Sequence, residues 1–186
     1  NITEDANFPV TDRLSKWGVP DHLLFAKAKN DLTAQAKAGF RDIKTRRPAF
    51  TVIQTSSSHE PFDVPYHRLS NPILNAFAYT DACVGDFIKY LKAAGRWNQS
   101  LIILVPDHLG AWPRNADSFK TWRFHVPLIW TGGMIKRPEV VPVYGSQQDI
   151  AATVLGQLGI NHSDMTFSKD LFSDAFHHAE IGRAHV

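Results

Sequence analysis

An Asp-His pair is the feature of this sequence whose residue types and spacing point most directly to chemistry. Asp107 and His108 follow an uninterrupted apolar run, Leu101–Val105, and Gly110 lies two residues beyond them. A carboxylate oxygen and an imidazole nitrogen can bind the same divalent cation, and a glycine lets the backbone pass close by. The same dipeptide also occurs in ordinary turns with a solvated imidazole, so the pair alone leaves two interpretations open.

A second reactive side chain, His59, lies in a polar loop that follows another expected strand. The run 49–55 is typical of a strand, and it leads into Ser56–Pro61. Ligands of open α/β folds bind beyond the carboxyl ends of the strands. We therefore expect His59 to face the same cleft as Asp107 and His108, and a hydrogen-bonded loop histidine is the alternative.

Helices and strands in alternation are expected to position these side chains. Apolar spacing predicts three helices, over residues 21–38, 72–95 and 148–158. Strands are expected at residues 49–55, 101–105 and 126–130. The last two are continuous apolar runs, which is typical of strands buried on both faces. The alternation predicts an α/β fold, with helices on the faces of a sheet.

The amino-acid composition excludes several classes of function. The chain has 186 residues, of which 44% are hydrophobic, and this is enough apolar material for one sizeable core. Its formal charge of +2 is too small to indicate nucleic-acid binding, and no basic run supports it. The only cysteine, Cys83, excludes an internal disulfide framework and any zinc site built from several cysteines.

Seven short segments form an ordered series of landmarks: Trp17–Asp21, Thr55–Phe62, Ala78–Asp81, Asp107–Gly110, Val126–Ile129, Gln148–Leu155 and Phe167–Leu171. Together they resemble the lipoteichoic acid synthase-like sulfatases, which are membrane-anchored members of the alkaline phosphatase superfamily. Several landmarks in the expected order are far more specific than any one of them. The resemblance implies part of a sulfatase-like sheet with helices on both faces.

The resemblance also implies a metal site. Family members that transfer phosphoglycerol hold one manganese or magnesium ion through a glutamate, a nucleophilic threonine and an Asp-His pair. That pair matches Asp107 and His108, and the family histidine that matches His59 contacts the phosphate of the substrate. A sulfatase would hold calcium instead. The glutamate and the threonine lie upstream in the family and have no counterpart here, so we expect the C-terminal part of a catalytic domain.

Two further residues are weaker candidates for the site. His125 precedes the expected strand at 126–130, where related sulfatases often place a basic residue near the anion. Trp112 lies four residues beyond His108 and is well placed to contact a ligand.

Both ends of the chain are expected to be truncated. Residues 180–186 resemble a translated sequencing adapter, so we expect a domain over residues 1–179 and a non-native tail. A disordered natural tail is the alternative.

The activity implied by the resemblance is metal-dependent transfer of a phosphoglycerol-type group. The acceptor is expected to be a membrane lipid or glycan at the extracytoplasmic face of a bacterial inner membrane, reached through anchoring helices upstream. A sulfatase is the first alternative, and a non-catalytic α/β binding domain is the second. Because the nucleophile has no counterpart here, we expect this chain by itself to be inactive and poorly stable.

Overall fold

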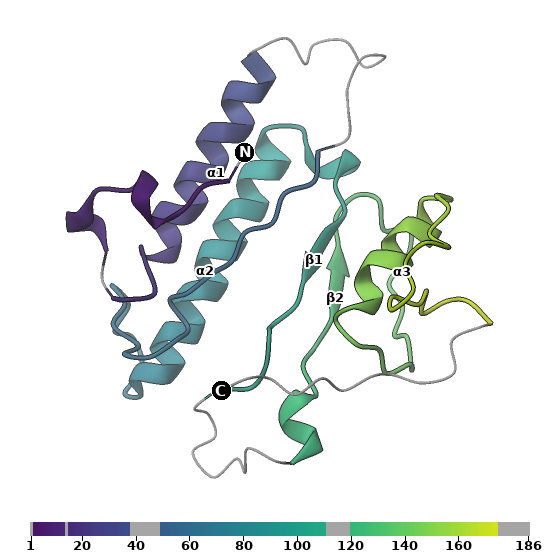
Figure 1. Cartoon of the computed structure of the whole chain (residues 1–186). Coiled ribbons are helices and arrows are strands. Elements are labelled where there is room, and N and C mark those ends of the chain that lie inside the picture. The colour runs from purple at the N-terminus through teal and green to yellow at the C-terminus, as the bar shows by residue number, and fades with distance from the viewer. Residues whose placement is uncertain (1, 14, 38–48, 111–119, 175–186) are drawn as a thin grey trace. The chain divides into compact units, whose positions relative to one another are not determined.

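The computed structural model describes residues 2–13, 15–37, 49–110 and 120–174. The described helices are α1 (Asp21–Lys37), α2 (Pro72–Ala93) and α3 (Asp149–Gln157), and the strands are β1 (Ile102–Leu104) and β2 (Ile129–Thr131) (Figure 1). Short 3-10 turns occupy Asp5–Asn7, Val10–Asp12, Trp97–Gln99 and Thr121–Phe124. The three predicted helices and the last two predicted strands are therefore confirmed. The expected tail at 180–186 lies outside the described residues.

The chain divides into two compact units, and each is described by itself. The first comprises residues 1–103, 110–115 and 130–134, and it holds α1, α2 and the loop that carries His59. The second comprises residues 104–109, 116–129 and 135–186, and it holds α3 and the Asp107–His108 pair.

The core of the first unit lies between α1, α2 and the segment that follows residue 52. Its buried side chains are Phe25, Val64, Ala76, Tyr79 and Cys83. The rings of Phe25 and Phe87 pack with their centroids 5.2 Å apart. Burial in this core raises the pKa of Tyr79 to about 12, and its hydroxyl accepts a hydrogen bond from the backbone N–H of His22 at 3.3 Å.

Capping residues explain where α2 begins and where α3 ends. Asn71 accepts hydrogen bonds from the N–H groups of Ile73 and Leu74, and Pro72 occupies the first turn, where its missing N–H costs nothing. Gly159 follows α3 with φ of +66°, and the N–H of Ile160 donates to the carbonyl of Leu155. This left-handed cap is the reason that a glycine stands there.

The two strands pair in an antiparallel sheet. The N–H of Met134 donates to the carbonyl of Ser100 beyond one end, and the N–H of Leu109 donates to the carbonyl of Arg123 beyond the other. The prediction that both strands are buried on both faces is wrong for the described chain. Every residue of β1 is half-buried and Ile129 of β2 is 50% exposed, because the described residues supply no third strand.

The strand predicted at 49–55 is also not found. This segment lies outside any sheet, and its Phe50 and Val52 side chains are exposed to 92% and 75%. Its β-favouring residues are not sufficient, because a strand also needs a neighbour for its ladder of hydrogen bonds, and the described residues provide none.

None of the described helices combines the length and the hydropathy that a bilayer crossing requires.

Candidate metal and anion site

The Asp107–His108 pair lies directly beyond β1, where the sequence predicted it. Its side chains converge, with Oδ2 of Asp107 3.4 Å from Nε2 of His108. The Asp107 side chain is 86% exposed and the imidazole is 39% exposed, so both donors are open to solvent. The backbone N–H of His108 also donates to Oδ1 of Asp107 at 2.8 Å, which orients the carboxylate.

The chemistry of this pair fits a divalent cation. Two donors that each lie about 2.1 Å from one ion are roughly 3.0–3.4 Å apart, and the two atoms named above have that spacing. A carboxylate and a neutral imidazole suit manganese well, whereas magnesium prefers an all-oxygen shell. Within the described ranges, no three His, Cys, Asp or Glu side chains gather into one group, so the pair can supply only part of a coordination shell from them.

A glutamine that the sequence analysis missed supports the backbone of this pair. Nε2 of Gln147 donates to the carbonyl oxygens of Pro106 and Asp107, each at 2.7 Å. These residues are 41 and 40 positions apart from Gln147 in the chain, so no local pattern could have indicated the contact.

The His59 loop is a series of tight turns. The N–H of His59 donates to the carbonyl of Ser56 at 3.1 Å, and the N–H of Phe62 donates to the carbonyl of His59 at 3.0 Å. Phe62 has φ of +60°, which is rare for a residue with a side chain, and its ring packs against the core. The half-buried Phe62 ring anchors the loop, while the His59 side chain stays 39% exposed.

Two neighbours orient the His59 imidazole. The ring packs against Trp17 with centroids 3.9 Å apart and the ring planes tilted by 39°, and its Nδ1 lies 3.4 Å from Oε2 of Glu60. Trp17 is placed by the preceding turn, in which its N–H donates to Oγ of Ser15. Sequence reasoning used Trp17 only as a landmark and missed this contact.

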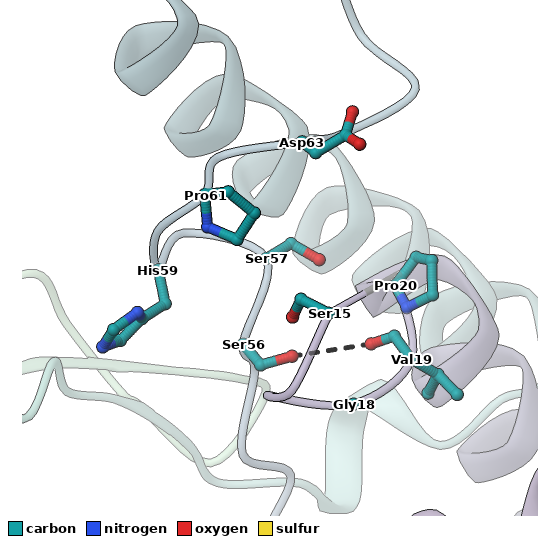
Figure 2. A pocket seen from close by; sticks show the side chains of 9 residues that line it. All are labelled: Ser15, Gly18, Val19, Pro20, Ser56, Ser57, His59, Pro61 and Asp63. Atoms are coloured by element: carbon teal, nitrogen blue, oxygen red, sulfur yellow. Dashed lines mark hydrogen bonds between the residues drawn. The ribbon is translucent and has the colours of Figure 1, made fainter. Parts of the chain in front are cut away.

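A small pocket opens beside the loop (Figure 2). Residues from the segments 15–20 and 56–63 line it, and Oγ of Ser56 donates across it to the carbonyl of Val19 at 3.5 Å. Gly18 lies on its wall with φ of +112°, and a Cβ there would come within 2.6 Å of Oδ1 of Asp5. The close approach explains the glycine.

A buried carboxylate ties the loop to both helices of the first unit. Asp21, the first residue of α1, has no exposed surface. Its Oδ1 accepts from the N–H groups of Ser56 and Ser57 at 3.0 and 3.1 Å, and its Oδ2 accepts from Oγ1 of Thr80 on α2 at 2.7 Å. The sequence analysis used Asp21 only as the end of a landmark segment, and it gave no indication of these partners.

The remaining predicted residues are placed as follows. His125 is exposed, and its ring packs against Tyr144 with centroids 5.0 Å apart. A role near the anion stays a prediction for His125. Trp112 lies outside the described residues. His59 belongs to the first unit and Asp107 to the second, so their shared cleft also stays a prediction.

Comparison with known proteins finds similarity over most of the chain. A family model described as Sulfatase matches residues 3–160. The lipoteichoic acid synthase-like protein YvgJ of Bacillus subtilis (strain 168) is 23% identical over 199 aligned positions, which cover 90% of this chain. A crystal structure of a protein in the alkaline phosphatase superfamily from Vibrio parahaemolyticus is 24% identical over 92% of this chain, with a TM-score of 0.73.

These likenesses confirm the predicted resemblance and the predicted fold class. The structural match shows an alkaline phosphatase-like α/β fold, of which α1 to α3 and the small sheet are parts. The chain spans 30% of the length of the Bacillus protein and 41% of the Vibrio chain.

Proposed function

The chain belongs to the sulfatase family, and from this premise we propose that Asp107 and His108 bind a divalent cation in an enzyme of phospho- or sulfo-ester chemistry. The observation that carries the proposal is the convergence of their donor atoms, 3.4 Å apart, beyond the carboxyl end of β1.

The reaction we propose is transfer of a phosphoglycerol-type group to a membrane lipid or glycan. The likeness to a lipoteichoic acid synthase-like protein supports this choice over sulfate-ester hydrolysis, which the family model also covers. We further propose that the reaction takes place at the extracytoplasmic face of a bacterial membrane, with an anionic phospholipid or glycan as the partner.

Each residue of this chain has a distinct part in the proposed reaction. Asp107 would bind the cation through a carboxylate oxygen and His108 through Nε2, and His59 would donate a hydrogen bond to a non-bridging oxygen of the substrate. When bound, manganese or magnesium would lower the pKa of the attacking hydroxyl and offset the negative charge of the ester. In a sulfatase, calcium would take that place.

One assay separates the two ester chemistries. A protein that contains this chain together with the family's upstream nucleophile is supplied with a phosphodiester or an aryl sulfate, each with manganese or calcium. Manganese-dependent turnover of the phosphodiester alone is the expected result. Turnover of the aryl sulfate alone would establish the sulfatase alternative, and inertness toward both would favour the binding domain.

We expect this chain, assayed by itself, to give no metal-dependent turnover of either ester. The family's threonine nucleophile has no counterpart in it, and loss of a nucleophile alone can lower a rate by about six orders of magnitude. The measurement is product release from residues 1–179 with manganese, against a buffer control. Metal-dependent turnover would refute the placement of the nucleophile upstream.

His59→Ala in the same nucleophile-containing protein is expected to lower turnover about 100-fold, because one donor to the developing charge is lost. Manganese affinity should stay nearly unchanged, since His59 is proposed to contact the substrate and not the ion. His67→Ala removes an exposed imidazole from the same unit and serves as the control. Loss of manganese binding in His59→Ala would contradict the assignment.

A further inference from the structure

The Asp107 side chain has little packing of its own to hold it in place. It is 86% exposed, so its direction depends on the backbone that carries it. A carboxylate that samples many rotamers and backbone conformations binds a cation more weakly than one that is already oriented. The groups that hold residues 106–109 therefore bear directly on the proposed cation site.

Besides the hydrogen bond from the N–H of His108 to the carboxylate, Gln147 restrains this backbone from a distant part of the chain. A carboxamide nitrogen carries two hydrogens, and Nε2 of Gln147 gives one to Pro106 and one to Asp107, both at 2.7 Å. The next backbone groups are also held, because the N–H of Leu109 donates to the carbonyl of Arg123. The two peptide units that frame the Asp107 Cα are thus oriented from outside the strand.

Gln147 has an exposed side chain on a backbone that is held by a turn. It lies in the turn before α3. There the N–H of Ser146 donates to Oδ2 of Asp149 at 2.8 Å, and the N–H of Asp149 donates to the carbonyl of Ser146. Asp149 is 1% exposed, and its Oδ1 accepts from the N–H of Lys169. A buried carboxylate thereby fixes the turn, and the turn fixes the backbone of the glutamine.

We propose that Gln147 is a positioning residue of the cation site, which it orients through the backbone of Pro106 and Asp107 without contacting the ion. This inference rests on the proposed role of Asp107 and His108 in binding a divalent cation. All four residues belong to the same compact unit.

The test is Gln147→Met in the protein that contains this chain together with the family's upstream nucleophile, with manganese as the probe. Methionine keeps the length of the side chain and adds no charge, whereas a glutamate would attract the cation by itself. Gln148→Met is the matched control, because Gln148 is the exposed N-cap residue of α3 and its side chain makes no capping hydrogen bond. Free manganese is measured by electron paramagnetic resonance, and unfolding by urea.

Gln147→Met is expected to weaken manganese binding about threefold to tenfold, because two hydrogen bonds to the ligand backbone are lost. Its urea midpoint should equal that of the parent protein, since both carbonyl groups return to water. A purely structural role would shift the urea midpoint and leave the affinity of the folded chain unchanged. Gln148→Met should match the parent protein in both measurements.

Asp107→Ala separates the failure of this inference from that of the proposed function. The inference alone is overturned if the parent binds manganese, Asp107→Ala abolishes that binding, and Gln147→Met leaves it unchanged. If Asp107→Ala binds manganese as the parent does, the cation site is elsewhere, and both the proposed function and the inference fall.

Discussion

Asp107→Ala is expected to lower the turnover of a protein that contains this chain and the family's nucleophile by about 10³-fold or more. The substitution removes a charged donor that converges with His108 to within 3.4 Å, and one imidazole alone binds a cation poorly. The measurement is the initial rate of phosphodiester turnover across a manganese titration. The residual rate of the variant should respond little to added manganese.

The control for this variant is Asp164→Ala, which removes an exposed carboxylate from the same compact unit. It should keep the parent rate and the parent manganese dependence. A rate for Asp107→Ala within about tenfold of the parent, with manganese dependence intact, would mean that the pair does not hold the catalytic ion.

Asp21→Ala is expected to lower the free energy of unfolding by about 3 kcal/mol or more. The N–H groups of Ser56 and Ser57 and the hydroxyl of Thr80 would lose their acceptor at a site with no solvent exposure. The change also leaves space where a fully buried side chain stood. Urea unfolding of the full chain, followed by the intrinsic fluorescence of its tryptophans, measures the difference.

Two comparisons sharpen this result. Asp21→Asn keeps one oxygen for the backbone donors and can donate to Thr80, so it should cost about half as much. Asp31→Ala removes an exposed carboxylate from the same helix, where it pairs with Lys27, and should cost at most about 0.5 kcal/mol. Equal midpoints for Asp21→Ala and Asp31→Ala would show that the buried carboxylate contributes nothing to stability.

Local signals predicted the helices and the position of the Asp107–His108 pair. Pro72 and Gly159 mark helix ends because each satisfies a constraint within one turn of its own chain. The apolar run before Asp107 predicted a strand because that signal, too, lies within the segment itself. The ordered landmarks then predicted the family, and the family-model match over residues 3–160 confirms it.

The supports of the candidate site could not be predicted in this way. Gln147 reaches a carbonyl 40 residues away, and Asp21 reaches backbone groups 35 and 36 residues away. Such contacts depend on the tertiary arrangement and leave no periodic trace in the sequence. The error at 49–55 has the same origin, because strand formation depends on a partner that composition does not reveal.

The way in which Asp21 holds the loop has a consequence for which substitutions the loop can accept. Its Oδ1 binds the main chain of residues 56 and 57, so the hold does not depend on the side chain at position 56. Both serines are also bound through their own side chains, since Oγ of Ser57 accepts from the N–H of Asp21 and Oγ of Ser56 donates to the carbonyl of Val19. Any residue except proline at position 56 therefore keeps the hydrogen bond from its N–H to Oδ1 of Asp21 and loses only the Oγ bond to Val19. Randomising position 56 would thus probe the wall of the small pocket while the main-chain hold on the loop stays in place.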